Sequence, residues 1–330
     1  SAFVIYNNSS GTDFAQSPST GRVYIIDDVL VKLKTGTSGT VWGSINNYTP
    51  GNTTIGTPKA VAVAPDNEDA IAVSDNVGIV KISNDRGVNW SALPTITNAS
   101  AVTINGIAGR GQILDVAVGP ARAGTLLGRE YAVAIADDTA ASTADGDVMM
   151  IGGTASWATV AANTGTADFY SVQFSPGYAG DRVLVATGIS TGLIPQLHYL
   201  NTSLNADVIT PINLTAALAA SDYGAAAAAT ALDIALPSNF DPTTAAGRVA
   251  YVGIGHTGTG ANDDVYRVDD ATPRALNAVT ATGTSPIDSV GYAGEVASGT
   301  LFVGYLSTTA KVKYSSNPTA TSPTWVASTN

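Results

Sequence analysis

The sequence predicts an all-β repeat fold, and three features support this prediction. Each of the four tryptophans opens a short apolar segment that follows a polar turn. Ser83–Trp90 reads S-N-D-R-G-V-N-W, and Thr35–Trp42, 48 residues earlier, repeats its length, its glycine and its tryptophan. Short alternating segments separated by turn residues recur about every 55 residues along the chain. Repeats of this length made of short strands predict a six-bladed β-propeller of four-stranded antiparallel blades.

The six units are expected to form one propeller domain over residues 1–330. A parallel β-helix is the other repeat fold considered, but its rungs are shorter and lack the regular grouping into four segments. The predicted blades are approximately 13–46, 59–93, 113–161, 170–213, 231–280 and 287–328.

The first strand of each unit is predicted from alternating residues followed in five cases by proline. Proline has no amide hydrogen to donate to a strand ladder, so it is expected to end the strand. The predicted first strands are Asp13–Pro18, Lys59–Pro65, Ile113–Pro120, Tyr170–Pro176, Ala231–Pro237 and Ile287–Tyr292.

The second strands are the most apolar segments and are expected to lie buried between neighbouring blades. They are predicted at Arg22–Asp27, Asp69–Asp75, Glu130–Asp137, Asp181–Gly188, Arg248–Gly255 and Thr300–Leu306. The third strands alternate more strongly with polar residues. They are predicted at Val29–Thr35, Val77–Ser83, Asp147–Gly152, Gln196–Asn201, Asp264–Val268 and Lys311–Ser315.

The outer strands carry the tryptophans in four of the six units. These strands are predicted at Thr40–Asn46, Asn89–Leu93, Ala155–Ala161, Asp207–Asn213, Arg274–Thr280 and Thr324–Ser328. Two segments fall outside the pattern. Residues 1–12 are expected to be an N-terminal extension strand with a linker, and the alanine-rich stretch Thr215–Thr230 a packed connection.

The turn before Trp90 resembles the Asp-box, or BNR-like, repeat of a superfamily that includes secreted prokaryotic surface propellers. Ser83, Asp85, Gly87 and Trp90 match that box, and Phe174–Asp181 is similar to the start of a blade in the same superfamily. The resemblance implies a structural role for the box: the aspartate caps backbone amides of a hairpin, the glycine adopts a left-handed conformation and the tryptophan packs under the turn.

Composition excludes several classes of function. The formal net charge is −11 and only 12% of the residues are charged, which disfavours nucleic acid and anionic membrane surfaces as partners. No apolar run approaches the roughly 18 residues that span a bilayer, so membrane insertion is not expected. There is no cysteine, and small uncharged residues dominate. This composition favours an extracellular or cell-surface location.

The residues offer little material for catalysis. The resemblance includes sialidases, which need three arginines around a carboxylate and a Tyr–Glu pair, and no arginine of this chain has that family's motif. Only two histidines, His198 and His256, are present, so histidine triads and zinc sites lack ligands. We therefore expect no enzyme activity, no catalytic residue and no cofactor-binding residue.

Clustered aspartates are the candidate metal ligands. Carboxylates gathered in loops can hold Ca²⁺, although loop aspartates more often form Asx turns, which is the favoured interpretation. The candidates for calcium are Asp137, Asp138, Asp145, Asp147, Asp263 and Asp264. A second set, Asp115, Asp233 and Asp288, recurs on the predicted first strands.

These observations favour a non-enzymatic structural protein that self-assembles into a surface layer, sheath or filament. Its partner would be a second copy of itself. The segment Phe3, Val4, Ile5 and Tyr6 is rich in β-forming residues and is the candidate inter-subunit strand. Two alternatives remain open: a secreted propeller that binds carbohydrate or peptide, and a degenerate sialidase-like glycosidase.

The sequence also predicts sites at which glycans could be attached. Eight asparagines begin an N-x-S/T sequon: Asn7, Asn8, Asn47, Asn52, Asn89, Asn98, Asn201 and Asn213.

Overall fold

The computed structural model describes thirteen stretches of the 330-residue chain. They are residues 11–16, 22–27, 32–36, 43–44, 58–75, 78–96, 112–136, 146–160, 167–215, 230–256, 263–278, 287–305 and 311–327. The predicted strand Phe3–Tyr6, the alanine-rich centre of Thr215–Thr230, and the calcium candidates Asp137, Asp138 and Asp145 lie outside these stretches.

The chain divides into two compact units, each built from three consecutive sheets. The N-terminal unit comprises residues 1–136 and 147–159, and the C-terminal unit comprises residues 137–146 and 160–330. In both units every sheet is antiparallel, and its strands follow one another in sequence order, except that Ile212–Asn213 pairs with Pro195–Asn201 and not with the strand before it. Each sheet is therefore a meander closed by short local connections.

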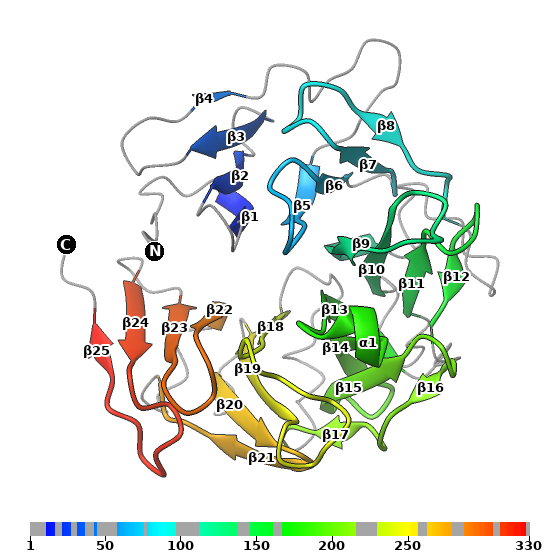
Figure 1. Cartoon of the computed structure of the whole chain (residues 1–330). Helices are drawn as coiled ribbons and strands as arrows, with labels where there is room; N and C mark the ends of the chain where they lie inside the picture. The colour runs from blue at the N-terminus through cyan, green and yellow to red at the C-terminus, as the bar shows by residue number, and fades with distance from the viewer. Residues whose placement is uncertain are drawn as a thin grey trace. The chain divides into compact units, whose positions relative to one another are not determined.

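The N-terminal unit contains twelve strands in three four-stranded sheets (Figure 1). The first sheet consists of β1 (Gly11–Gln16), β2 (Val23–Asp27), β3 (Lys32–Gly36) and β4 (Gly43–Ser44). The second consists of β5 (Pro58–Val63), β6 (Ile71–Asp75), β7 (Val80–Ser83) and β8 (Ser91–Ala92). The third consists of β9 (Gln112–Ala121), β10 (Arg129–Ala136), β11 (Asp147–Ile151) and β12 (Ala158–Thr159).

The C-terminal unit has the same plan with one additional strand. Its first sheet consists of β13 (Ala167–Phe174), β14 (Val183–Ser190), β15 (Pro195–Asn201), β16 (Ala206–Asp207) and β17 (Ile212–Asn213), with α1 (Tyr178–Asp181) between β13 and β14. The second consists of β18 (Thr230–Ala235), β19 (Val249–His256), β20 (Asp264–Asp269) and β21 (Thr272–Ala275). The last consists of β22 (Ile287–Ala293), β23 (Thr300–Tyr305), β24 (Lys311–Ser315) and β25 (Val326–Ala327).

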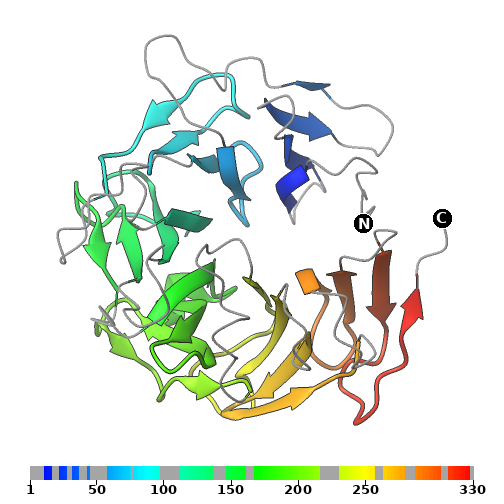
Figure 2. The ribbon, with the colours of Figure 1, turned by 180° about the vertical axis from the view of Figure 1, so that it is seen from behind.

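Within each unit the first strands of successive sheets lie side by side. Strand β5 contacts both β1 and β9 in the N-terminal unit, and β18 contacts both β13 and β22 in the C-terminal unit. Figures 1 and 2 show from opposite sides that the short last strands lie at the other end of their sheets. Apolar side chains fill the space between facing sheets, as between β5–β8 and β9–β12. Successive propeller blades have this arrangement.

Two second strands, β10 and β14, are buried almost throughout, as their composition predicts, whereas β23 alternates buried and half-buried residues. All eight residues of β10 are buried, and seven of the eight in β14. A strand covered on both faces has no solvent-facing positions, so its residues read as a continuous apolar run such as Val183-Leu184-Val185-Ala186. This continuous pattern is why the second strands were the easiest elements to predict.

Several predicted boundaries were wrong. The outer strands β8 and β12 contain two residues each, not five and seven, because the described residues on either side of them are not in the ladder. The predicted outer strand Asp207–Asn213 is two separate pieces, β16 and β17, which both pair with β15. Gly11 and Thr12, which were predicted as linker, belong to β1. Pro120 does not end its strand, because β9 continues to Ala121.

No helix among the described residues is long and apolar enough to cross a membrane. The only helix in them, α1, has four residues and ends at Asp181; the next residue, Arg182, has a left-handed conformation with φ of 61°. Its function is structural, because the Arg182 amide donates to the Tyr178 carbonyl at 3.1 Å and closes the turn between β13 and β14.

Candidate functional site

The turn between β7 and β8 is held by its own polar side chains. Asp85 Oδ1 accepts the Asn89 amide at 2.8 Å and the Ser83 hydroxyl at 2.7 Å. Ser83 Oγ in turn accepts the Gly87 amide at 2.8 Å. Arg86 and Gly87 have φ of 61° and 83°, and glycine adopts this left-handed conformation without a Cβ clash. These bonds lower the pKa of the Asp85 carboxyl, the Asn89 amide having the largest effect. The charged form of Asp85 therefore stabilises the turn.

A second turn uses the same bonds, and the sequence prediction missed it. In the last sheet Asn317 replaces the aspartate: its Oδ1 accepts the Ser315 hydroxyl at 3.0 Å and the Thr324 amide at 2.9 Å. Thr324, like Asn89, directly precedes a tryptophan and an outer strand. The turn was overlooked because asparagine is neutral and the loop is longer, yet its amide oxygen supplies the acceptor that the turn needs.

The described tryptophans all directly precede an outer strand, but their indoles have different partners. Trp90 Nε1 donates to the Gly87 carbonyl of its own turn at 2.9 Å. Trp157 Nε1 donates instead to Pro94 of the preceding sheet at 2.8 Å, and Trp325 Nε1 to Leu276 of the preceding sheet at 3.1 Å. Trp157 and Trp325 therefore connect neighbouring sheets. Trp42 lies outside the described residues.

Three calcium candidates are in the described residues. Two of them form hydrogen bonds that hold the third and outer strands of a sheet together. Asp264 begins β20 and accepts the amides of Asn277 and Ala278, at 2.6 and 2.7 Å, from the chain that follows β21. Asp147 begins β11 in the corresponding position and accepts the Thr159 hydroxyl at 2.8 Å. Asp263 is the buried neighbour of Asp264. Across the described stretches no group of three metal-ligating side chains is gathered.

Asp147 gives the N-terminal unit a pH-dependent stability. The side chain is fully buried, and burial raises its pKa to about 6 from 3.8. Because the folded-state pKa is the higher one, folding favours the protonated form. The unit should therefore lose stability as pH rises from about 4 to 6, by about 3 kcal/mol at 1.36 kcal/mol per pKa unit.

Asp147→Asn removes this charge and keeps an oxygen for the Thr159 hydroxyl. We expect equal stability of variant and parent at pH 4, and a variant that is more stable by up to about 3 kcal/mol at pH 7. Urea unfolding at both pH values measures the difference. Asp264→Asn is the control: it leaves one of two backbone donors facing an NH₂ group and should destabilise at pH 7. If the stability of Asp147→Asn relative to the parent were lower at pH 7 than at pH 4, the raised pKa of Asp147 would be contradicted.

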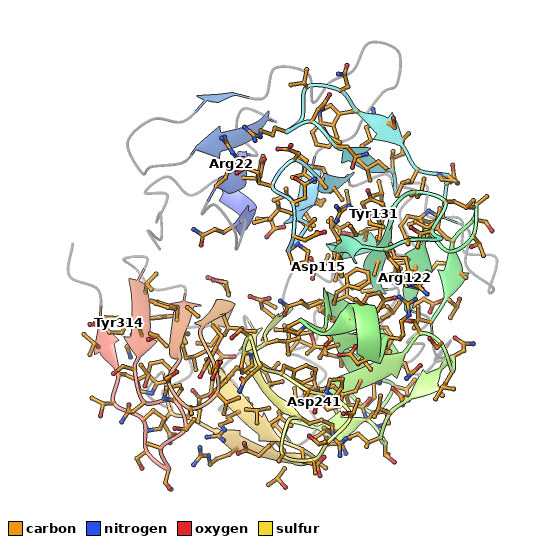
Figure 3. The ribbon with its side chains drawn as sticks, viewed as in Figure 1. Arg22, Asp115, Arg122, Tyr131, Asp241 and Tyr314 are labelled. Carbon is orange, nitrogen blue, oxygen red and sulfur yellow. The ribbon has the colours of Figure 1, made fainter. Side chains whose placement is uncertain are left out.

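Two aspartates on first strands connect neighbouring sheets. Asp13 Oδ2 accepts the Val61 amide of the next sheet at 2.7 Å. Asp233 Oδ2 likewise accepts the Val290 amide of the next sheet at 2.8 Å. Asp115, labelled in Figure 3, accepts the amide of its own neighbour Val116 at 2.7 Å, and desolvation raises the pKa of Asp288 to about 6. Asp13 and Asp233 are thus structural groups that hold first strands together.

The position of the first strand at the edge of its sheet explains why its amides are available to the preceding sheet. Alternate amides of an edge strand point away from its partner strand. Val61 of β5 and Val290 of β22 lie in register with the second strand, and each donates its amide to an aspartate of the preceding sheet. Register shifts also occur near the start of the first strand in five sheets, at β1, β5, β9, β13 and β22.

Ion pairs add further bonds between neighbouring sheets of the N-terminal unit. Glu68, after β5, accepts Arg22 Nε of the first sheet at 3.2 Å and Arg86 of its own sheet at 2.7 Å (Figure 3 labels Arg22). Asp66 accepts Arg129 at 2.9 Å and the Ala121 amide at 2.9 Å, both from the third sheet. The pairs between sheets could not be predicted from the sequence, because their partners are 46 and 63 residues apart.

Pairing at the outer edges of the sheets is short. Strand β24 has five residues, but only Lys313 and Tyr314 pair with β25. Strand β7 pairs with β8 through Lys81 and Ile82, and the Val80 carbonyl also accepts the Leu93 amide at 2.9 Å. Tyr314 and its cross-strand partner Val326 are 37% and 43% exposed, which places an apolar surface on the last sheet (Tyr314 is labelled in Figure 3). Such edges are templates for the addition of a strand.

His198 is placed for packing. Its ring is 2% exposed and lies edge-on to Phe169, with centroids 5.0 Å apart. The nearest carboxylate, Asp207, is 3.7 Å from Nδ1, beyond hydrogen-bonding distance. A ring enclosed in this way cannot reach a substrate from solvent.

Comparison with known proteins supports the fold class. Neither a protein-family model nor a curated protein matches the sequence. The chain is similar to YCF48 from Cyanidioschyzon merolae (TM-score 0.52, 13% identity, 91% of this chain and 93% of that one). It is also similar to YCF48 bound to a D1 peptide (TM-score 0.50, 13% identity, 92% and 79%).

Two glycoside hydrolases of family GH74 are also similar. An ancestral GH74 enzyme has a TM-score of 0.59 at 17% identity and covers 99% of this chain, and the GH74 enzyme of Niastella koreensis has a TM-score of 0.56 at 12% identity and covers 97%. The chain spans 40% and 47% of their lengths. Together with the sequential four-stranded sheets, these similarities show an all-β protein of the β-propeller class. That six sheets form one ring remains a prediction from the sequence.

Proposed function

We propose that this chain is an extracellular, non-enzymatic structural propeller that assembles with copies of itself into a surface layer, sheath or filament. The observation that carries the proposal is the short outer strand. Among the described residues, two-residue outer strands pair with only two of the five residues of β11 and two of the five residues of β24. Unpaired backbone amides and carbonyls at a sheet edge bind an extended segment by β-augmentation.

The proposed donor is the segment Phe3–Tyr6. It carries no charge and is rich in β-forming residues. Each described sheet already has a first strand, and the earliest begins at Gly11, so the six sheets do not require this segment. Asn7–Ser10 are polar residues that can connect a donated strand to β1, since four extended residues span at most about 14 Å.

The last sheet is the preferred acceptor. Tyr314 and Val326 form an exposed apolar pair at its outer edge, where the side chains of an added strand can pack. The competing arrangement is that Phe3–Tyr6 folds back as a fifth strand on a sheet of its own chain. Both arrangements supply hydrogen-bond partners to the backbone at the sheet edge, but only donation of Phe3–Tyr6 to another copy links subunits.

Deletion of residues 1–8 tests the proposal. We expect the truncated protein to fold, with an unchanged far-UV circular dichroism spectrum, and to remain monomeric under conditions in which the full chain forms ordered polymers. Electron microscopy and light scattering measure assembly. The matched control is the double substitution Phe3→Asp and Ile5→Asp, which keeps chain length and should also prevent assembly. Normal polymers from the truncated protein would overturn strand donation by this segment.

The Asp-box family is the second part of the proposal. The bonds made by Ser83, Asp85 and Gly87 and their repetition at Ser315 and Asn317 support it. In this family the box stabilises a hairpin and implies no activity, which agrees with the structural role proposed here. We infer from the acidic, cysteine-free composition that the chain functions outside the cell.

The runner-up is a secreted propeller that binds peptide or carbohydrate. One structural neighbour is YCF48 with a D1 peptide bound, and the same exposed sheet edges suit a peptide in extended form. A glycosidase is the third candidate, since two neighbours are GH74 enzymes. Electron microscopy separates the candidates, because ordered homopolymers are expected from the structural protein alone.

A further inference from the structure

The hairpin between β15 and β16 presents an N-x-S sequon in solvent. Asn201, Thr202 and Ser203 form this sequon. Asn201 is half-buried, whereas Ser203 and the residues up to Ala206 are exposed. Leu204, at the tip, is 76% exposed, the highest value among the large exposed apolar side chains of the described residues. The hairpin therefore projects from its sheet, and its side chains are accessible to a large external enzyme.

The sequon is held in an Asx turn. Asn201 Oδ1 accepts the amides of Ser203 and Leu204, at 3.0 and 2.9 Å. The Thr202 hydroxyl donates to the Arg182 carbonyl at 3.0 Å and lies 3.1 Å from the Tyr178 hydroxyl, which fixes the base of the hairpin. The side-chain oxygen of Asn201 is thus engaged, while within the described structure its Nδ2 makes no hydrogen bond. An Asx turn brings the first and third residues of the sequon close together.

The other two sequons in the described residues differ in this respect. Asn89 Nδ2 donates to Asp85 Oδ2 at 2.6 Å, so its amide nitrogen is part of the Ser83–Trp90 turn. Asn213 Oδ1 accepts Gln196 Nε2 at 2.8 Å, and the hydroxyl of Thr215, the third residue of that sequon, is bonded to Tyr266. Asn201 is therefore the sequon with both a free amide nitrogen and an exposed third-residue hydroxyl.

We propose that Asn201 is the acceptor of an N-linked glycan. This inference rests on the extracellular location in the proposed function, because N-x-S/T acceptors are modified in exported proteins. The donor is an oligosaccharide carried on a lipid phosphate. Asn201 Nδ2 attacks the anomeric carbon, the new C–N bond forms, and the bond from that carbon to the phosphate oxygen breaks. The lipid phosphate leaves, and the proton lost from Nδ2 passes to a base of the transferring enzyme.

The experiment uses the folded full-length chain, an oligosaccharyltransferase and a lipid-linked oligosaccharide, followed by peptide mapping by mass spectrometry. We expect Asn201 to be occupied at least tenfold more than Asn89, the matched control within the same chain. Ser203→Ala should reduce occupancy at Asn201 at least tenfold. This substitution keeps the backbone amide that Asn201 accepts, so the hairpin should persist. Equal occupancy at Asn201 and Asn89, or no modification of Asn201, would overturn the proposal.

The same peptides from the protein isolated from its own cells separate the two proposals. Fractionation locates the protein, and mass spectrometry measures Asn201 independently. Unmodified Asn201 in protein recovered outside the cell would refute the glycan and leave the structural role intact. Protein recovered only from the cell interior would refute the extracellular role. The reaction with the oligosaccharyltransferase would then still decide whether Asn201 in the folded hairpin is an acceptor.

Discussion

Replacing Trp157 with alanine is expected to destabilise the N-terminal unit by about 3–5 kcal/mol, the range for a large buried aromatic side chain. Trp157 is 8% exposed and packs in the apolar cluster between β5–β8 and β9–β12. Its indole also donates to Pro94 of the preceding sheet at 2.8 Å. The substitution therefore opens a cavity between two sheets and removes a hydrogen bond that connects them.

Chemical denaturation followed by far-UV circular dichroism measures this loss. Trp157→Phe serves as the matched control, because it keeps most of the ring and removes the N–H; it should cost roughly 0.5–1.5 kcal/mol for the hydrogen bond. Trp325→Ala should cost less than Trp157→Ala, since Trp325 is only half-buried. If Trp157→Ala were no more destabilising than Trp157→Phe, Trp157 would not be the packing residue that we describe.

Replacing Gly255 with valine is expected to destabilise the C-terminal unit by about 1–3 kcal/mol or more, because the added atoms meet backbone and not a flexible side chain. A Cβ on Gly255 of β19 would lie 2.6 Å from the Ile287 nitrogen of β22. A Cβ on Gly253 would lie 2.7 Å from Ile287 Cγ2. The two glycines thus let the first strand of the last sheet approach β19 closely.

Gly180→Ala is the control for this prediction. A Cβ at Gly180 meets no atom within 4 Å, and alanine is the better helix former in α1. We expect its free energy of unfolding to equal or slightly exceed that of the parent. Chemical denaturation of both variants under the same conditions gives the comparison, and a Gly255→Val protein as stable as Gly180→Ala would show that β22 can move away from β19 at little cost.

The sequence predicted the fold class and the order of the strands because those depend on local alternation. Second strands such as β10 could be read directly, since burial on both faces produces an unbroken apolar run. The outer strands were overestimated because apolar residues after a tryptophan indicate packing and do not show how many residues pair. β8 and β12 stop after two residues although apolar residues, Leu93 and Val160, follow them.

The interpretation of single residues depended on contacts that sequence cannot show. Asp264 and Asp147 look like calcium ligands in a list of acidic residues, yet each begins a third strand and binds groups in or just after the outer strand. The Asn317 turn was missed because a neutral amide replaces the aspartate of the motif. Gly253 and Gly255 were predicted only as part of the second strand Arg248–Gly255; their close approach to Ile287 requires the neighbouring sheet.

The meander order of every sheet has a consequence for how the chain folds during synthesis or export. Each sheet is built from strands that follow one another directly, and within each unit a sheet contacts the next one along the sequence. Most contacts are therefore made between segments that emerge within a few tens of residues of each other, which favours rapid folding. A sheet can form as soon as its last strand has emerged and then serve as the surface on which its successor condenses. With no cysteine in the chain, this vectorial process requires no oxidation step, and it can proceed equally well in a reducing or an oxidising compartment.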